Sequence, residues 1–334
     1  MLSVKENFLE TIKKDGKPDR LVNGYEFLGL VVPDPVLIAS QHGLSMGQTG
    51  KDGFGVTWEW GEGQPAAAPL PKEEVIVIKD IADWKNVLQI PNLEDLDWTD
   101  AKAQAEAIRE TDQFVTAFFP SGVFERLHFL MGFEDTLVNL MIEQDLVKEL
   151  IAEIVKYRKR YVDLLIENLN PEMFFFHDDW GMKRSLFTSP EVWREMIKPA
   201  YVELYEYVAN KGIIVVHHAD SFLEPIVEDM ANMHISVWQG VLPENDIPKL
   251  QKELDGRMVL MGGIDATVCD APTATEEDVR KEARRVLEQY APGGHFIPSF
   301  TYGGPQDMLY MDRNEFIKDE VRKYNEEVFG VKYE

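Results

Sequence analysis

From about residue 100 onward, the chain alternates between β-branched or aromatic runs and stretches with a helical pattern. The runs predicted as strands are QFVTAFFP, MFFFHDDW, residues 213–218, ISVWQG, MVLMGG and HFIPS, and the predicted helices are 100–110, 124–140, 144–168, 190–210, 222–232, 246–254, 275–289 and 311–328. Strands separated by helices form right-handed βαβ units, which place the strands parallel in one sheet. The alternation therefore predicts an α/β protein built on a parallel sheet.

Several predicted strands end in polar or glycine residues, namely His177-Asp178-Asp179, His217-His218-Asp220, Gln239-Gly240, Gly262-Gly263-Ile264-Asp265 and Ser299-Phe300-Thr301-Tyr302. In a (β/α)8 barrel such ends meet at one rim, where enzymes of this architecture keep their chemistry. A doubly wound sheet is the alternative, but it ordinarily has a glycine-rich phosphate turn, and the chain contains neither GxGxxG nor GxxxxGK followed by Ser or Thr. We therefore expect a (β/α)8 barrel of the TIM type.

The N-terminal third has a different composition from the rest. Residues 21–100 are rich in Gly, Pro and Trp, and a short strand, VIVIKD, is predicted within them. The chain has no internal repeat and no low-complexity linker. We expect one domain over 1–334, in which residues 1–100 form an irregular cap and extension over part of the barrel and residues 101–334 form most of the barrel.

Charge and cysteine content narrow the function classes. The 34 basic and 59 acidic side chains give a net charge of −25, which repels nucleic acid and anionic membrane surfaces. A single cysteine, Cys269, excludes a disulfide framework and a multi-cysteine metal site. There is no apolar run of 18 residues and the N-terminal stretch reads as a charged amphipathic helix, so the expected location is the cytoplasm.

The segment 213–226, IIVVHHADSFLEPI, is the strongest candidate for a chemical site. A buried strand ends there in His217, His218 and Asp220. In the spacing His-x-Asp an extended backbone directs His218 and Asp220 to the same side, about 7 Å apart at their Cα atoms, so the two can share a cation or a substrate. A His–Asp hydrogen bond at a strand end is the alternative interpretation.

A second candidate group is His177, Asp178 and Asp179. Adjacent acids on a strand point to opposite sides, so one of Asp178 and Asp179 faces the pocket while the other caps a loop. Aromatic residues near predicted strand ends, among them Trp180, Phe118 and Tyr302, are candidates for an apolar pocket wall, or they fill the core. Arg126 follows the strand QFVTAFFP, and it either receives a substrate carboxylate or forms a surface salt bridge.

Together these segments resemble the uroporphyrinogen decarboxylase superfamily, and in particular its corrinoid-dependent methyltransferases. The resemblance rests on the opening ENFLETIKKDGKPDR, the segments DDWG and SPEVWRE, and the stretches VVHHADSFLEPIVEDM, GRMVLMGGIDA and GGHFIPSFTYGGP, and it extends from about residue 5 to the C-terminal end. It implies a (β/α)8 barrel whose pocket lies at the carboxyl ends of the strands. The superfamily's decarboxylases carry an arginine-rich N-terminal motif for a substrate with eight carboxylates. Here Arg20 stands alone before an apolar run, so that substrate is not expected.

The resemblance also implies a metal site. Thiol-activating members of the family hold zinc by His-x-Cys and a later Cys, and in an alignment through Pro225 the positions of His and first Cys are occupied by His218 and Asp220, while the later Cys is absent from HFIPSFTYGGP. A site without Cys makes a zinc ion a harder Lewis acid, which suits polarisation of an ether oxygen. We expect zinc on His218 and Asp220 with a third ligand among Asp178, Asp265 and Tyr302, or, without metal, a general-acid pair.

The function that this resemblance implies is transfer of a methyl group from a small methylated donor, expected to be a methoxylated aromatic compound, to a corrinoid protein. His218, Asp220, Asp178 and His177 are the candidate catalytic residues, and Asp179, Trp180, Phe118, Arg126, His217 and Tyr302 the candidate substrate-binding residues. The chain has no Asp-x-His-x-x-Gly cobalamin motif, so the corrinoid is expected on a partner protein. A decarboxylase of a small carboxylic acid and a noncatalytic ligand-binding relative are the alternatives.

Overall fold

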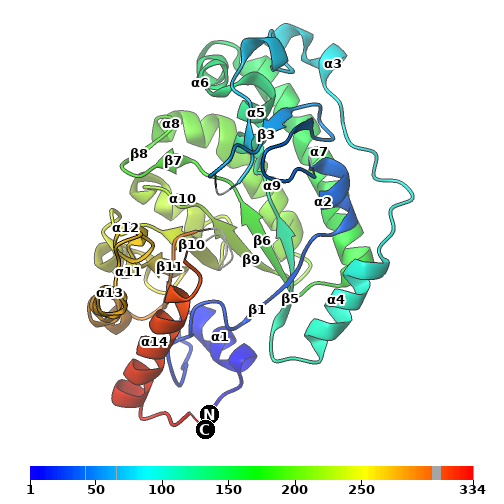
Figure 1. Ribbon diagram of the computed structural model, residues 1–334. Coiled ribbons are helices and arrows are strands. Elements are labelled where there is room, and N and C mark those ends of the chain that lie inside the picture. Colours follow the sequence, from blue (N-terminus) through cyan, green and yellow to red (C-terminus); the bar gives the residue numbers. More distant parts are fainter. Residues whose placement is uncertain (42, 65, 303–309, 334) are drawn as a thin grey trace.

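The computed structural model describes residues 1–41, 43–64, 66–302 and 310–333 (Figure 1). Within these residues the main sheet has seven strands in the order β1-β5-β6-β9-β10-β11-β12, and every neighbouring pair is parallel. The strands are β1 Leu28–Val31, β5 Phe114–Phe119, β6 Met173–His177, β9 Ile214–His218, β10 Val237–Val241, β11 Val259–Gly263 and β12 Phe296–Ser299. The parallel α/β sheet predicted from the sequence is confirmed.

The six strands expected after residue 100 are all present, but the first third of the chain differs from expectation. Strand β1, which was not predicted from the sequence, joins the sheet beside β5. The prediction of a strand over VIVIKD is wrong, because Glu73–Val75 forms a 3₁₀ helix and the following residues are irregular. Ile78 is buried and its backbone N–H donates to the carbonyl of Leu130, so the segment packs against a helix instead of pairing with a strand.

The helices follow the predicted pattern with local differences. They are α1 Val4–Ile12, α2 Pro35–Ser40, α3 Trp84–Val87, α4 Thr99–Arg109, α5 Val123–Met131, α6 Phe133–Ile142, α7 Gln144–Leu169, α8 Pro190–Val192, α9 Lys198–Ala209, α10 Val227–Ala231, α11 Ile247–Leu254, α12 Ala266–Cys269, α13 Glu276–Tyr290 and α14 Arg313–Phe329. The single helix expected over 124–140 is two helices, because Gly132 takes a φ of 83° and breaks the helical path. In the described chain, no helix combines the length and apolar character needed to cross a bilayer.

The sheet is curled, with a separate apolar core on each face. Every one of its strands contributes to one small inner cluster, which α1 closes with Phe8: Phe8, Val22, Phe27, Leu28, Phe114, Met173, Phe175, Val216, Val237, Val259, Met261 and Ile297. A flat sheet of this width cannot bring its two edges to one cluster of this size. The outer face packs against the surrounding helices (Figure 1). The architecture is therefore of the TIM type, although the described residues contain no eighth strand between β12 and β1.

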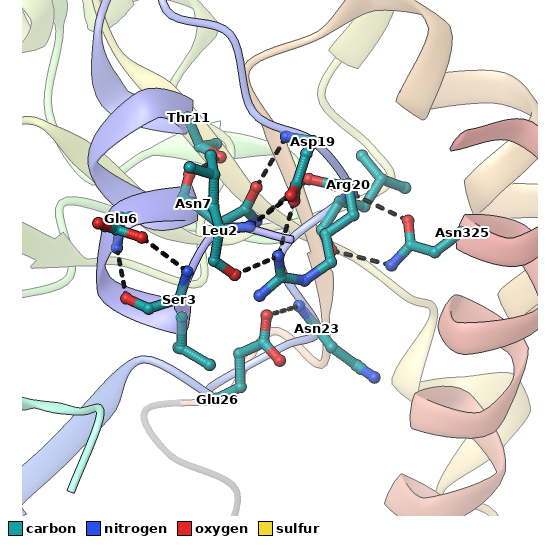
Figure 2. Close-up of polar contacts among 12 residues, drawn as sticks. Leu2, Ser3, Glu6, Asn7, Thr11, Asp19, Arg20, Asn23, Glu26 and Asn325 are labelled. Atoms are coloured by element: carbon teal, nitrogen blue, oxygen red, sulfur yellow. Dashed lines mark hydrogen bonds and ion pairs between the residues drawn. The ribbon is translucent and has the colours of Figure 1, made fainter. Parts of the chain in front are cut away.

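The N-terminal segment holds the edge of the sheet against the last helix (Figure 2). Ser3 and Glu6 form a capping box that begins α1. The Arg20 guanidinium donates to the carbonyl of Leu2 at 2.9 Å and to Asp19 at 2.7 Å. Asn325 of α14 exchanges two hydrogen bonds with the backbone of Leu21. These contacts position the chain that enters β1.

Two small antiparallel sheets complete the fold. Strands β2 Thr49–Lys51, β3 Thr57–Glu59 and β4 Ala68–Pro69 form one of them, and β7 Gly181–Met182 and β8 Ser185–Leu186 form the other. The first belongs to the Gly- and Trp-rich extension, and the second follows directly after the end of β6. Both small sheets therefore lie near the carboxyl ends of the barrel strands, where the polar residues are found.

Candidate active site

The ends of three adjacent strands place three polar side chains in one row. The β-sheet register pairs His177 of β6 with His218 of β9, and His218 with Gln239 of β10. Residues paired across parallel strands point to the same face of the sheet. The imidazole rings of His177 and His218 accordingly stack, with their centroids 4.4 Å apart and an angle of 27° between their planes. The row is a compact polar site built on rigid strands.

Gln239 determines which nitrogen of His218 carries the proton. The Gln239 Nε2 donates to the carbonyl oxygen of Tyr302 at 2.8 Å and to the Tyr25 hydroxyl at 2.9 Å, and a carbonyl oxygen only accepts, so the amide orientation is defined. Its Oε1 then faces Nδ1 of His218 at 2.5 Å, and Nδ1 must be the donor. Burial, reinforced by His177, lowers the pKa of His218 to about 3. His218 is therefore neutral, and its lone pair is on Nε2, the ring nitrogen that does not contact Gln239.

His177 has the opposite charge preference. Its Nδ1 lies 3.1 Å from the Glu125 carboxylate of α5. Burial acts to lower the pKa of His177, but the Glu125 charge and hydrogen bond outweigh it and raise the pKa to about 10. The same pairing overcomes the effect of burial on Glu125 and lowers the pKa of its carboxyl group. In the protein without metal, His177 and Glu125 thus form a partly buried ion pair beside a neutral His218.

Asp179 joins the two histidines to form a candidate metal site. Its Oδ1 accepts from the backbone N–H of Asp220 at 2.9 Å and from the Ser221 hydroxyl at 3.1 Å, which orients the carboxylate. One ligand atom from each of His177, Asp179 and His218 lies within 4.8 Å of the others. Two zinc bonds of about 2.0–2.2 Å span at most about 4.4 Å, so small rotations of these side chains would bring all three atoms onto one ion. The donor set of two imidazoles and a carboxylate fits a catalytic zinc ion or a similar divalent cation.

Asp220 is not part of this group of three. Its backbone, not its side chain, makes the contact with Asp179. Burial and the charge of Asp179 raise the pKa of the Asp220 carboxyl group to about 7. The structure thus brings His218 together with Asp179 and His177, and leaves Asp220 beside them as an acid that holds its proton near neutral pH.

The residues suggested as a third ligand are engaged elsewhere. Asp178 accepts from the backbone N–H groups of Phe124 and Glu125, which begin α5, and from the Trp180 indole and the Tyr201 hydroxyl. Asp265 caps α12 through the N–H of Thr267. The Tyr302 hydroxyl donates to Asp270 at 3.1 Å. Of the two adjacent acids that follow β6, Asp179 therefore faces the candidate metal site and Asp178 is a helix cap.

His217 and Trp180 lie in the layer behind the site. His217 is fully buried and stacks on Trp180 at a centroid distance of 4.1 Å, and its Nδ1 contacts the Tyr205 hydroxyl at 2.7 Å. Successive residues of a strand point to opposite faces, so His217 faces the outer helices while His218 faces the barrel interior. The geometry gives both residues a packing role behind the strands.

A cavity of about 410 Å³ opens beside His177. Its walls combine charged and small residues with four large aromatic side chains, which are Phe118 of β5, Phe129 of α5, and Trp58 and Trp60 from the N-terminal extension. The volume suits a ligand the size of a substituted benzene ring. A second cavity, of about 570 Å³, lies between the N-terminal segment and α14, and among the described residues that line it there is none of the predicted site residues. The cavity of about 410 Å³ is therefore the one that adjoins the polar residues at the strand ends.

Arg126 lines this cavity, but its charge is already paired. Its Nη1 lies 2.8 Å from Oδ2 of Asp52, and both side chains are buried. Its guanidinium also lies over the ring of Phe54 at 4.0 Å. A surface salt bridge was the alternative expected for Arg126. Arg126 does form a salt bridge, but it is buried and not on the surface. The roles of Asp52 and Glu125 were not predicted from the sequence, because their partners Arg126 and His177 are distant from them in the chain.

Comparisons with known proteins agree with this architecture. No curated protein sequence matches the chain significantly. A solved structure described as a methyltransferase from Methanosarcina mazei is similar over 97% of this chain and 99% of that chain, with a TM-score of 0.65 and 16% sequence identity, which is a likeness of fold. The structure of Dispersin B is similar over 69% of this chain and 75% of its own at 14% identity, and its TM-score of 0.37 is too low to support an argument.

The family model described as Uroporphyrinogen decarboxylase (URO-D) matches residues 49–323. Because that match covers most of the chain, the protein belongs to the URO-D family.

Proposed function

We propose that the protein is a methyltransferase that moves a methyl group from a small methoxylated aromatic donor to the corrinoid of a partner protein. The observation that carries this proposal is the group His177, Asp179 and His218 at the strand ends, beside an aromatic cavity of about 410 Å³. The URO-D family and the similar fold of a structure described as a methyltransferase support it. The net charge of −25 and the single cysteine support a cytoplasmic enzyme that does not bind nucleic acid.

The three residues would hold zinc or a similar divalent cation. In this position the cation supplies Lewis acidity to the ether oxygen of the donor. Gln239 keeps His218 in the tautomer whose Nε2 is free to bind, and Glu125 orients His177. Asp220 would complement the site as a proton donor to the departing oxygen, since in the protein without metal burial and the charge of Asp179 raise the pKa of its carboxyl group to about 7.

The reaction breaks the bond between the methyl carbon and the ether oxygen. Both electrons of that bond stay on the oxygen, and the methyl carbon bonds to the reduced corrinoid, which is the second substrate. The phenolate that leaves needs a cation or a proton, because its oxygen is poorly stabilised in a buried site without one. Trp58, Trp60 and Phe118 would hold the aromatic ring, and Arg126 would contact a polar substituent.

The partner must cover the mouth of the barrel. In-line displacement requires the corrinoid within a few ångströms of the methyl carbon, and the sequence has no corrinoid-binding motif of its own. The corrinoid protein must leave again to deliver its methyl group, so we expect a transient interface of about 1,200 Å² or less.

The decisive experiment mixes the purified protein, zinc and 3-methoxybenzoate with a candidate corrinoid protein in the Co(I) state. We expect the absorbance spectrum of the corrinoid to change to that of its methylated form and 3-hydroxybenzoate to appear in equal amount. His218→Ala should abolish both. Release of carbon dioxide from an acid without corrinoid would instead show a decarboxylase, the activity in the family's name, and an absence of both reactions would indicate a ligand-binding relative.

A further inference from the structure

Arg158 of α7 is a buried cation without a counter-ion among the described residues. Its side chain is only 5% exposed and its guanidinium lies over the ring of Phe119 at 4.9 Å. Within the described part of the chain it makes no hydrogen bond or ion pair with a carboxylate. Charged groups in protein interiors are normally paired, because an uncompensated buried charge is strongly unfavourable. The buried charge of Arg158 therefore requires a compensating anion, and the described residues do not supply one.

A small enclosed cavity lies between Arg158 and Arg126. It holds about 20 Å³, which is room for one group the size of a water molecule. Ser40, Pro120 and Arg126 line this cavity and also the larger aromatic cavity, so the two adjoin each other. The small cavity forms a polar extension of the aromatic one.

Tyr157 adds a hydrogen-bond donor to the same cavity. The residue is 9% exposed, and its buried hydroxyl makes no well-formed hydrogen bond in the described chain, although the Ser40 side chain lies beside it. Burial raises the pKa of Tyr157 to about 12, so the hydroxyl keeps its proton. A buried hydroxyl that lacks a partner is rare in folded proteins, and it is satisfied when a ligand supplies an acceptor.

The buried carboxylates of this region are already occupied. Asp52 pairs with Arg126 and also accepts the N–H groups of Phe54 and Val56. Asp34 accepts from the Tyr161 hydroxyl and from the first N–H groups of α2. One of the two guanidinium groups at the small cavity is therefore left without a carboxylate.

We propose that the carboxylate of the methyl donor binds where the two cavities meet, with one oxygen in the small cavity and with Arg158, Arg126 and Tyr157 as hydrogen-bond donors. A carboxylate has two acceptor oxygens, and planar guanidinium groups bind it with directed hydrogen bonds. The ring would lie in the aromatic cavity, with the methoxy group toward His177. The inference rests on the proposed function and narrows its substrate class to aromatic acids.

The test measures binding to the protein alone, with no corrinoid present. Isothermal titration calorimetry with 3-methoxybenzoate and with the neutral 3-methoxybenzyl alcohol compares the same ring with and without the anionic group. We expect the acid to bind at least tenfold more tightly than the alcohol, which is the lower end of the range for charged hydrogen bonds. Arg158→Met should remove this preference and leave the affinity for the alcohol unchanged.

The matched control is Arg160→Met on the same helix. Arg160 is exposed and pairs with Glu167 at 3.3 Å. Its loss should alter neither affinity. Thermal unfolding of the free protein provides the second readout, since a purely structural Arg158 would lower the melting temperature when replaced. A binding role predicts an equal or higher melting temperature for Arg158→Met, because the variant no longer buries an unpaired charge.

The outcomes separate this inference from the function. Equal affinities for acid and alcohol, or an Arg158→Met variant that melts earlier and still prefers the acid, would overturn the carboxylate site even if methyl transfer occurs. Binding of the acid through Arg158 without any methyl transfer would uphold the site and refute the proposed reaction. A titration with sodium chloride tests whether the cavity is a general anion site. If millimolar chloride weakened binding of the acid as much as Arg158→Met does, the cavity would not select a carboxylate.

Discussion

The Nδ1 of His218 and the Oε1 of Gln239 lie 2.5 Å apart, on neighbouring strands of the sheet. This contact makes Gln239 a positioning residue, because it leaves Nε2 as the only nitrogen of His218 that can bind a metal. The carbonyl of Tyr302 holds the amide in turn, so the chain of contacts reaches from the segment after β12 to the candidate metal site. Partners of this kind commonly contribute 10- to 100-fold to metal affinity.

We therefore expect Gln239→Leu to weaken zinc binding by about 10- to 100-fold while His177, Asp179 and His218 remain in place. Competition with a chromophoric chelator measures the affinity. Gln251→Leu is the matched control, since Gln251 is also buried and its amide donates to two backbone carbonyls far from the site. If Gln239→Leu held zinc as tightly as the unmodified protein, the assigned tautomer would have no role in binding.

A second prediction separates Asp179 from Asp220. Asp179→Ala should remove stoichiometric zinc, because it deletes one of three ligands. Asp220→Ala should retain the zinc and lose activity, since its carboxyl group lies outside the group of three and serves as an acid. Metal analysis after dialysis gives the zinc content directly. Loss of zinc from Asp220→Ala with retention in Asp179→Ala would restore the His-x-Asp pair as the metal site.

The sequence was sufficient to predict the parallel sheet, and it singled out two histidines that the structure brings together, His177 and His218. His177 and His218 could be found because polar residues at the end of a buried strand stand out from the pattern of that strand. The expected pairing of His218 with Asp220 assumed that the backbone stays extended beyond the strand. In the structure β9 ends at His218, and the acid that reaches the histidines comes from the neighbouring strand.

Residues whose role depends on long-range packing could not be predicted. Arg158 is one of several charged residues on α7, and only the rotation of that helix against β5 shows that it is buried. Strand β1 is four residues long and lies in a region rich in Gly and Pro, so its local pattern is too short to identify it. Its strand character comes from pairing with β5, which is an interaction between distant parts of the chain.

The thiol of Cys269 should be inert in the folded protein. The residue is fully buried, and burial, together with Glu282 and Asp265, raises its pKa to about 12. An exposed thiol has a pKa of about 8.5 and reacts markedly faster as the pH rises from 7 to 9. We expect no such increase with an aromatic disulfide reagent, and reaction of one thiol per chain after unfolding in guanidinium chloride. Rapid labelling of the native protein would show that Cys269 is accessible.

The last prediction concerns Asp178, which the structure assigns to stability. Its carboxylate accepts from two N–H groups of α5, from the Trp180 indole and from the Tyr201 hydroxyl, all of them buried. Asp178→Ala leaves these donors without an acceptor, so we expect the free energy of unfolding to fall by about 3 kcal/mol or more, with zinc content unchanged. Asp97→Ala is the comparison, because Asp97 caps Thr99 at an exposed position and its loss should cost about 1 kcal/mol. Denaturant unfolding measures both values. A stable Asp178→Ala variant that has lost its zinc would instead place Asp178 among the metal ligands.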